Sequence, residues 1–223
     1  TKHYAILGAT SVAMNLGGMT FALSKLGTAL TAILVTTIPL YSALIETVWG
    51  KVKHTPLMIL GLWIGFGGVV ILIGFSSQEL NKDFLLGFLG STIASFGFAL
   101  GGNYSKVKAQ HIGAWEQTIG TFTFGGLYLL PFMFIVPIVK TPTFAAFGWL
   151  FLLSATASSL AYILYFRLVA EIGATKALTT EFMVPVVAVF VGAVFLSEKV
   201  TVTDLIGAAA ILLGSSLVLG LLP

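Results

Sequence analysis

The sequence contains no cysteine and little charge. Its 223 residues include 11 Lys or Arg and 8 Asp or Glu, so only 9% are charged, against roughly 25% in ordinary soluble domains. The absence of cysteine excludes disulfides, thiolate nucleophiles and cysteine-bound metals. The shortage of charge excludes a water-soluble globular protein, because such a protein covers its surface with solvated charged side chains.

The sequence is instead rich in long apolar runs, and 57% of its residues are hydrophobic. A helix needs roughly 20 apolar residues to cross a hydrocarbon core of about 30 Å. We therefore predict an all-α integral membrane protein, in contact with the lipid bilayer, with about eight transmembrane helices. They are expected over residues 4–23, 28–50, 57–76, 84–104, 115–138, 144–169, 174–196 and 202–222.

The basic residues are scattered singly or in pairs along the chain, which gives no sign of a nucleic-acid partner. If the eight helices alternate in direction, seven basic residues fall on one side and four on the other. The first side holds Lys2, Lys51, Lys53, Lys106, Lys108, Arg167 and Lys176, and the second holds Lys25, Lys82, Lys140 and Lys199. The positive-inside rule then predicts that both termini are cytoplasmic, in a bacterial-type inner (plasma) membrane.

An internal repeat emerges when the chain is shifted by 146 residues, because Gly and Pro positions then coincide. The shift pairs Gly27 with Gly173, Pro39 with Pro185, Thr55 with Thr201, Gly61 with Gly207 and Gly68 with Gly214. The first three helices thereby correspond to the last three. An offset of five helices is odd, so the two copies are predicted to have opposite orientations in the membrane, as in many secondary transporters.

The repeat predicts two halves of unequal length, an incomplete first repeat over residues 1–80 and a second repeat over residues 81–223. The helices at 84–104 and 115–138 have no upstream counterparts. We therefore expect the first half to lack two leading helices. The first residue is Thr and not Met, which agrees with a missing N-terminal part.

The segment from Glu171 to Gly214 resembles the closing part of EamA-type transporters of the drug/metabolite transporter superfamily. It has a mid-helix Pro185, the pair Ser197-Glu198 and the motif Ile206-Gly207-Ala208. The stretch from Leu26 to Gly68 looks like the same pattern, although Val52 stands where the family often has Glu. The resemblance implies ten helices in two inverted halves and the export of amino acids or similar small organic compounds.

Polar side chains recur at helical spacing on several apolar runs, so each set lies on one helix face. Together they predict a central substrate cavity of hydroxyls, amides and aromatic rings. The candidates for its lining are Asn15, Tyr41, Ser95, Thr121, Ser158 and Tyr162. The alternative is that these residues only make close contacts between helices, where Ser and Thr are common.

Two carboxylates, Glu46 and Glu181, lie within apolar runs, and an acid inside a membrane is by default a functional candidate. Glu181 is placed among the cavity residues, about two turns inside its helix. The alternative for Glu181 is a structural ion pair with Arg167 or Lys176. For Glu46 it is extension of the side chain to the membrane interface.

Pro39 and Pro185 lie in the middle of predicted helices at repeat-related positions, where a proline removes one backbone hydrogen bond and bends the helix. We interpret them as hinge or kink positions, with simple packing as the alternative. The three histidines lie at helix ends or in loops without metal-ligand spacing. No metal site, cofactor site or catalytic group is predicted, so an enzyme is not expected.

The sequence thus predicts a secondary transporter that moves a small organic metabolite by alternating access. The alternative is a non-transporting membrane scaffold, or a subunit that needs a second chain to complete its fold. A homodimer or a completing subunit is accordingly the partner to look for, besides a small-molecule substrate.

Overall fold

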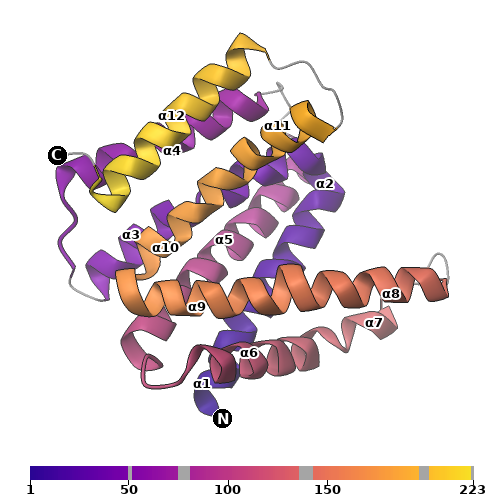
Figure 1. The fold of residues 1–223 in the computed structure, drawn as a ribbon. Coiled ribbons are helices and arrows are strands. Elements are labelled where there is room, and N and C mark those ends of the chain that lie inside the picture. Colours follow the sequence, from indigo (N-terminus) through magenta and orange to yellow (C-terminus); the bar gives the residue numbers. More distant parts are fainter. Residues whose placement is uncertain (50–51, 75–80, 136–142, 196–200, 222–223) are drawn as a thin grey trace.

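The structure is a computed structural model that describes residues 1–49, 52–74, 81–135, 143–195 and 201–221. Every regular element in these ranges is helical, which confirms the all-α prediction (Figure 1). Seven helices are long and apolar enough to cross a membrane. They cover Lys2–Thr28, Leu30–Val48, Pro56–Ile73, Lys82–Lys108, Phe144–Ile172, Ala174–Phe195 and Val202–Leu219.

Several of these spans are built from more than one element. In chain order the elements are α1 (Lys2–Leu7), η1 (Gly8–Met14), α2 (Asn15–Val35), α3 (Ile38–Val48), α4 (Pro56–Ile73), α5 (Lys82–Lys108), α6 (Ala114–Leu129), α7 (Phe132–Ile135), α8 (Phe144–Leu153), η2 (Ser154–Leu160), α9 (Ala161–Ile172), α10 (Ala174–Leu178), η3 (Thr179–Phe182), α11 (Met183–Phe195) and α12 (Val202–Leu219). Elements η1 and η2 are π-helical, and η3 is a 3₁₀-helix.

The predicted continuous helix over 115–138 is wrong in its middle. Helix α6 ends at Leu129, and α7 begins at Phe132. Pro131 lies between them and cannot donate the backbone hydrogen bond that would continue α6. This helix is therefore too short to be counted among the seven spans, and residues 136–138 lie outside the described ranges.

The second predicted helix, over 28–50, is divided once, and a glycine turns the chain just before it. Gly27 turns the chain with a φ of 75° and a ψ of 178°, inside the range assigned to α2. Glycine suits this position because a side chain at positive φ is strained. A two-residue turn at Thr36 and Thr37 then separates α2 from α3, so the helix that contains Pro39 begins anew at Ile38.

Small residues allow two helix pairs to pack closely. A Cβ added at Gly61 of α4 would lie 2.6 Å from the carbonyl oxygen of Gly214 on α12, and one added at Gly18 of α2 would lie 2.7 Å from the carbonyl oxygen of Gly90 on α5. These two pairs form the broadest contacts between elements. Helices α9 and α10 lie between the α4–α12 pair and α6 (Figure 1).

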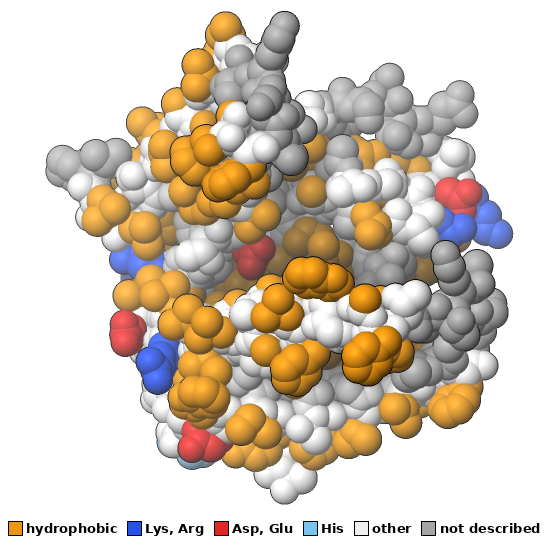
Figure 2. All heavy atoms as spheres, turned by 45° about the vertical axis from the view of Figure 1, so that its right-hand side comes forward, with side chains coloured by type: hydrophobic (Ala, Val, Ile, Leu, Met, Phe, Trp, Pro, Cys, Tyr) orange, Lys and Arg blue, Asp and Glu red, His pale blue; other side chains and the backbone are white. Residues whose placement is uncertain are grey.

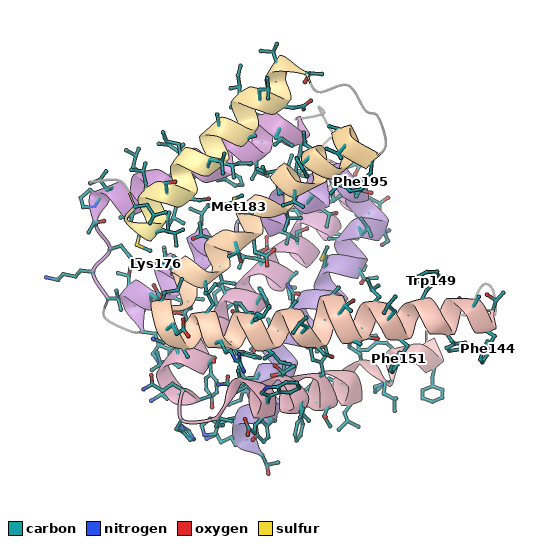
Figure 3. The ribbon with its side chains drawn as sticks, viewed as in Figure 1. Phe144, Trp149, Phe151, Lys176, Met183 and Phe195 are labelled. Carbon is teal, nitrogen blue, oxygen red and sulfur yellow. The ribbon has the colours of Figure 1, made fainter. Side chains whose placement is uncertain are left out.

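The outer surface is apolar, as a lipid-facing surface must be. Large hydrophobic side chains are exposed along the spans, and orange side chains cover much of the face in Figure 2. The described part of α8 and η2 contains no buried residue at all. Phe144 and Trp149 on α8 are exposed, on the part of the span that extends beyond the other helices (Figure 3).

Candidate functional site

An aromatic cluster occupies the middle of the molecule around Tyr162 of α9. The Tyr162 ring centroid lies 4.8 Å from that of Phe122 on α6 and 5.9 Å from that of Phe98 on α5. Tyr165, one turn further along α9, stacks on Phe98 with centroids 5.1 Å apart. The consecutive helices α5 and α6 thus present aromatic rings to α9.

The Tyr162 hydroxyl donates a 2.8 Å hydrogen bond to the carbonyl oxygen of Ser11. Ser11 lies in the π-helical segment η1, where the shifted backbone pattern changes which carbonyls are occupied within the helix. The bond joins two spans that are 151 residues apart in sequence. It places a predicted cavity residue against the first helix of the chain.

Glu181 lies in the short 3₁₀ segment η3, between Lys176 and Met183 (Figure 3). It is partly exposed. Figure 2 looks into a hollow in the middle of the molecule, and an acidic side chain is visible inside it.

Asn15, Ser95 and Thr121 are buried at contacts between helices. The Asn15 amide donates a 3.3 Å hydrogen bond to the carbonyl of Ala94, and the Ser95 hydroxyl donates a 3.2 Å bond to that of Leu34. The Thr121 hydroxyl has no hydrogen-bond partner among the described residues. Ser95 therefore supports the α2 backbone just before the turn at Thr36.

Tyr41 and Ser158 lie at less buried positions. The Tyr41 ring meets that of Phe96 on α5 edge-on, with centroids 6.1 Å apart. Ser158 is half-buried in the π-helical segment η2. Both prolines are buried and follow an interruption of the helix, Pro39 after the turn at Thr36 and Pro185 after η3.

A second polar site surrounds Glu46, near the end of α3. One carboxylate oxygen, Oε1, accepts hydrogen bonds from the backbone N–H groups of Ala174 (3.1 Å) and Thr175 (3.2 Å). The other, Oε2, accepts a 2.7 Å bond from the Thr175 hydroxyl and lies 3.6 Å from Nε2 of His54. Glu46 therefore caps α10, so its side chain extends to another helix.

The Glu46 contacts continue into a buried chain of hydrogen bonds. The hydroxyl oxygens of Thr175 and Ser42 lie 2.9 Å apart, and the Asn103 amide donates a 2.9 Å bond to the Ser42 hydroxyl. Thr175 has one hydroxyl hydrogen and gives it to Glu46, so Ser42 donates to Thr175. The chain ties α5, α3 and α10 together at one end of the bundle.

Sequence reasoning missed this network, although Glu46 had been considered. Ser42 and Glu46 are four residues apart and share a helix face, which is a signal for a polar pair. Asn103 and Thr175 join them only through the fold, because both lie more than 60 positions from Ser42. Gly173 makes the junction accessible, since its φ of 93° exposes the first N–H groups of α10.

A cavity of about 530 Å³ opens beside this network. Its walls combine polar or charged side chains with apolar ones. The polar residues include Glu46, Lys53, His54, Asn103, Lys106, Glu171 and Lys176. Lys106 and Lys176 donate hydrogen bonds to the carbonyls of Ala170 (2.5 Å) and Leu219 (3.4 Å), at or near the ends of α9 and α12.

Three curated proteins are similar to most of this chain. The uncharacterized transporter YoaV of Bacillus subtilis is 26% identical over 96% of this chain and 74% of its own length. The uncharacterized transporter YvbV of the same organism is 25% identical over 92% of this chain and 67% of its own. An uncharacterized transporter of Archaeoglobus fulgidus is 28% identical over 88% and 68%.

A solved crystal structure shares the fold, with a TM-score of 0.75 over 96% of this chain and 84% of its own, at 15% sequence identity. The model of the EamA-like transporter family matches residues 85–220, more than half of the chain. The resemblance seen in the Pro and Gly pattern is thereby confirmed. The chain belongs to the EamA-like transporter family, whose members are membrane transporters and not enzymes.

Proposed function

We propose that this protein is a secondary transporter that moves a small organic metabolite by alternating access between two inverted halves. The observation that carries the proposal is the recurrence of the same backbone irregularities 146 residues apart. The π-helical segments η1 and η2 are both seven residues long and begin at Gly8 and Ser154. Such segments are rare and concentrate at functional sites.

The other irregularities follow the same offset. Gly27 and Gly173 both have positive φ before a helix, and Gly74 and Gly220 both have positive φ after one. Helices α4 and α12 have 18 residues each and are capped by Thr55 and Thr201. This agreement supports the division into a first repeat over residues 1–80 and a second over residues 81–223.

The packing of α4 on α12 supports an inverted arrangement of the repeats. Gly61 meets Gly214, and Gly68 meets Gly207, so the two helices run antiparallel. When each residue is replaced by its repeat-related residue, Gly61 becomes Gly207 and Gly214 becomes Gly68, so the first contact becomes the second. A two-fold axis relates two copies in this way. An axis that relates antiparallel membrane helices is perpendicular to them, and therefore lies in the plane of the membrane.

We infer that Glu46 closes one end of the substrate path, and we call its bonds to Ala174 and Thr175 the Glu46 latch. The 146-residue repeat relates Glu46 to Gly192 and Ala174 to Thr28. Gly192 has no side chain, so it cannot make an equivalent hydrogen bond to the backbone at Thr28. The latch is therefore present at one end only. Alternating access then consists of breaking the latch while the opposite end closes.

We place the substrate between the latch and the aromatic cluster, at the height of the two helix interruptions. The proposed lining comprises Asn15, Tyr41, Ser95, Thr121, Ser158, Tyr162 and Glu181, with Pro39 and Pro185 as hinges. Asn15, Ser95 and Thr121 are buried between helices in this structure, so they would join the lining only when the halves move apart. The sequence contains no Walker motif, so the driving force is proposed to be a proton or substrate gradient.

The experiment is to lock the latch with a disulfide. The Ser42 and Thr175 hydroxyl oxygens are 2.9 Å apart, and the chain has no cysteine of its own, so S42C/T175C introduces the only pair. In proteoliposomes, oxidation is expected to stop uptake of a ¹⁴C-labelled amino acid mixture, and dithiothreitol to restore it.

The control pair is S105C/Q117C, which joins α5 to α6 within the second repeat, where Ser105 and Gln117 are hydrogen-bonded. Oxidation of this pair is expected to leave uptake unchanged. Full uptake by the oxidised S42C/T175C protein would contradict alternating access through this latch.

The exposed face of α8 and η2 favours a second role, as a subunit whose fold another set of helices completes. The related segment η1 is largely buried against α5 and α6, whereas η2 has no buried residue. Helices equivalent to α5 and α6 are therefore expected to cover η2 in the membrane. Light scattering in detergent tests this, because a single chain has a mass of 23.5 kDa and an assembly has more.

A further inference from the structure

Three lysines from three different elements line the cavity beside the Glu46 latch. Lys53 lies in the segment that precedes α4, Lys106 near the end of α5, and Lys176 in α10. Neither of the two ion pairs found among the described residues includes any of the three, so no described carboxylate lies within 4 Å of their ammonium groups. The cavity therefore gathers three ammonium groups that no described carboxylate pairs.

Hydrogen bonds hold two of these ammonium groups in position. Lys106 donates to the carbonyl oxygen of Ala170, in the last turn of α9. Lys176 donates to that of Leu219, the last residue of α12. A lysine beside the carboxyl end of a helix is favoured by the helix dipole. An ammonium group has three hydrogens and each bond uses one, so up to two donors on each lysine remain for a ligand.

The start of α4 adds a hydroxyl donor and the positive end of a helix dipole. Thr55 also lines the cavity, and its Oγ1 accepts a 3.2 Å hydrogen bond from the backbone N–H of Met58. Because the oxygen acts there as an acceptor, the hydroxyl still has its own hydrogen to donate. Helix α4 is 18 residues long, and the first turn of a helix attracts anions. The lysines and this helix end therefore favour a ligand of the same charge.

Two carboxylates also line this cavity, Glu46 and Glu171. Both oxygens of Glu46 accept hydrogen bonds from α10, so this carboxylate is already bonded within the protein. Glu171 is exposed, so water and salt screen its charge. Three lysines thus stand against one bonded and one solvated carboxylate, and this balance favours an anion.

Exposed apolar side chains border the same charges. The cavity has a volume of about 530 Å³, within the range of roughly 300–1,000 Å³ for small-molecule sites. Val52, Val107 and Ile172 line it and are 46%, 39% and 41% exposed. Basic side chains next to apolar ones, at the end of a membrane-spanning bundle, match a phospholipid with an anionic headgroup and apolar chains.

We propose that the cavity beside the Glu46 latch binds a phosphate group, carried by an anionic phospholipid or free in solution. The three lysines and the Thr55 hydroxyl surround the phosphate oxygens. Ammonium groups from three elements suit a tetrahedral phosphate, which presents oxygens in several directions, better than a planar carboxylate. The inference goes beyond the proposed transport function, because binding here needs no movement of the two halves.

The first arm of the test measures lipid binding to the purified full chain in detergent micelles, by native mass spectrometry. It compares dioleoylphosphatidylglycerol, which is an anion, with dioleoylphosphatidylcholine, whose phosphate is neutralised by its own ammonium group. The apolar chains are identical, so a difference reports the headgroup. We expect one tight phosphatidylglycerol site, with a dissociation constant at least about tenfold below that for phosphatidylcholine.

Variants assign this preference to the cavity. Lys53→Gln removes an exposed ammonium group that makes no hydrogen bond to a described residue, so folding is expected to stay intact. Phosphatidylglycerol binding is expected to weaken about fivefold, the contribution of one lysine near a membrane surface. Lys108→Gln is the matched control, because Lys108 is exposed at the same end of α5 but does not line the cavity. It is expected to change nothing.

The second arm replaces the lipid with sodium phosphate, with sodium chloride keeping the ionic strength constant, and follows thermal unfolding by tryptophan fluorescence. A saturable rise in Tm that Lys53→Gln reduces, without a lipid preference, assigns the site to free phosphate. A lipid preference without such a rise assigns it to a phospholipid, and a response in both arms assigns it to the phosphate group itself.

No response in either arm would overturn the phosphate site. So would a response that Lys53→Gln leaves unchanged, or one that Lys53→Gln and Lys108→Gln reduce equally, because the charge of the whole surface would then explain it. The comparison of wild type with the two lipids needs no variant, and neither arm measures uptake. Failure of this site is thereby distinguished from failure of the transport function.

Discussion

At the scale of single residues, Glu46 and Glu181 show how one residue type performs two roles. Glu46 has all the partners a carboxylate needs, two backbone N–H groups and a hydroxyl. Glu181 has no hydrogen bond or ion pair to a described residue. A satisfied carboxylate stabilises the contact it makes, whereas an unsatisfied one remains available for a ligand. The two acids are therefore expected to respond differently to the same substitution.

Glu46→Ala is expected to lower the free energy of unfolding by about 2 kcal/mol, because it leaves the first N–H groups of α10 without an acceptor. Thermal unfolding in detergent, followed by tryptophan fluorescence, measures the change. Glu171→Gln is the control, since Glu171 is exposed beside the same cavity and makes no hydrogen bond to a described side chain or backbone group. Equal melting temperatures for wild type and Glu46→Ala would show that the latch contributes no stability.

At the scale of elements, glycine decides how near two helices come. The backbones of α4 and α12 almost touch at Gly68, where an added Cβ would lie 2.8 Å from both the Gly207 carbonyl oxygen and the Ile211 nitrogen. Gly67, the preceding residue, has nothing within 4 Å of such a Cβ. Of these two neighbouring glycines on α4, Gly68 therefore packs against α12, whereas Gly67 has space for a side chain.

Gly68→Ala is expected to destabilise the protein by about 1–3 kcal/mol, because the added methyl group forces α4 and α12 apart. Gly67→Ala is expected to be neutral or to stabilise by up to about 1 kcal/mol, because alanine favours the helix. Chemical unfolding of both variants in mixed micelles compares the two values. A smaller loss at Gly68 than at Gly67 would contradict the close contact of the helices.

At the scale of the whole molecule, charge divides between the two ends of the bundle. Lys53, Lys106 and Lys176 surround the cavity beside the Glu46 latch. At the opposite end of α5, Lys25 pairs with Asp83 at 2.7 Å. The larger basic group agrees with the distribution predicted from alternating helices, and we propose that this end faces the cytoplasm.

Labelling of introduced cysteines tests this orientation, because the chain has none of its own. In intact cells a membrane-impermeant maleimide is expected to react with Lys82→Cys and not with Lys53→Cys. Both positions are exposed, Lys82 at the start of α5 and Lys53 in the segment that precedes α4. After the cells are opened, both variants are expected to react, which controls for accessibility. Reaction of Lys53→Cys alone in intact cells would reverse the orientation.

The sequence by itself determined the helical class, seven of the spans, and the Pro and Gly pattern that revealed the family. These features are local, because hydrophobicity over about 20 residues decides whether a helix crosses a membrane. The same reasoning failed at Pro131, where one residue ended a helix that composition alone would have continued. Local patterns also left open what each polar side chain contacts.

The tertiary structure alone decided which polar residues meet. Glu46 binds α10 from 129 positions away, and Tyr162 binds the Ser11 carbonyl from 151 positions away. No pattern along the chain encodes these pairs, because they depend on how the helices cross. Their helices cross where glycines permit close approach and where interrupted helices expose backbone groups, so the site is a property of the packed bundle.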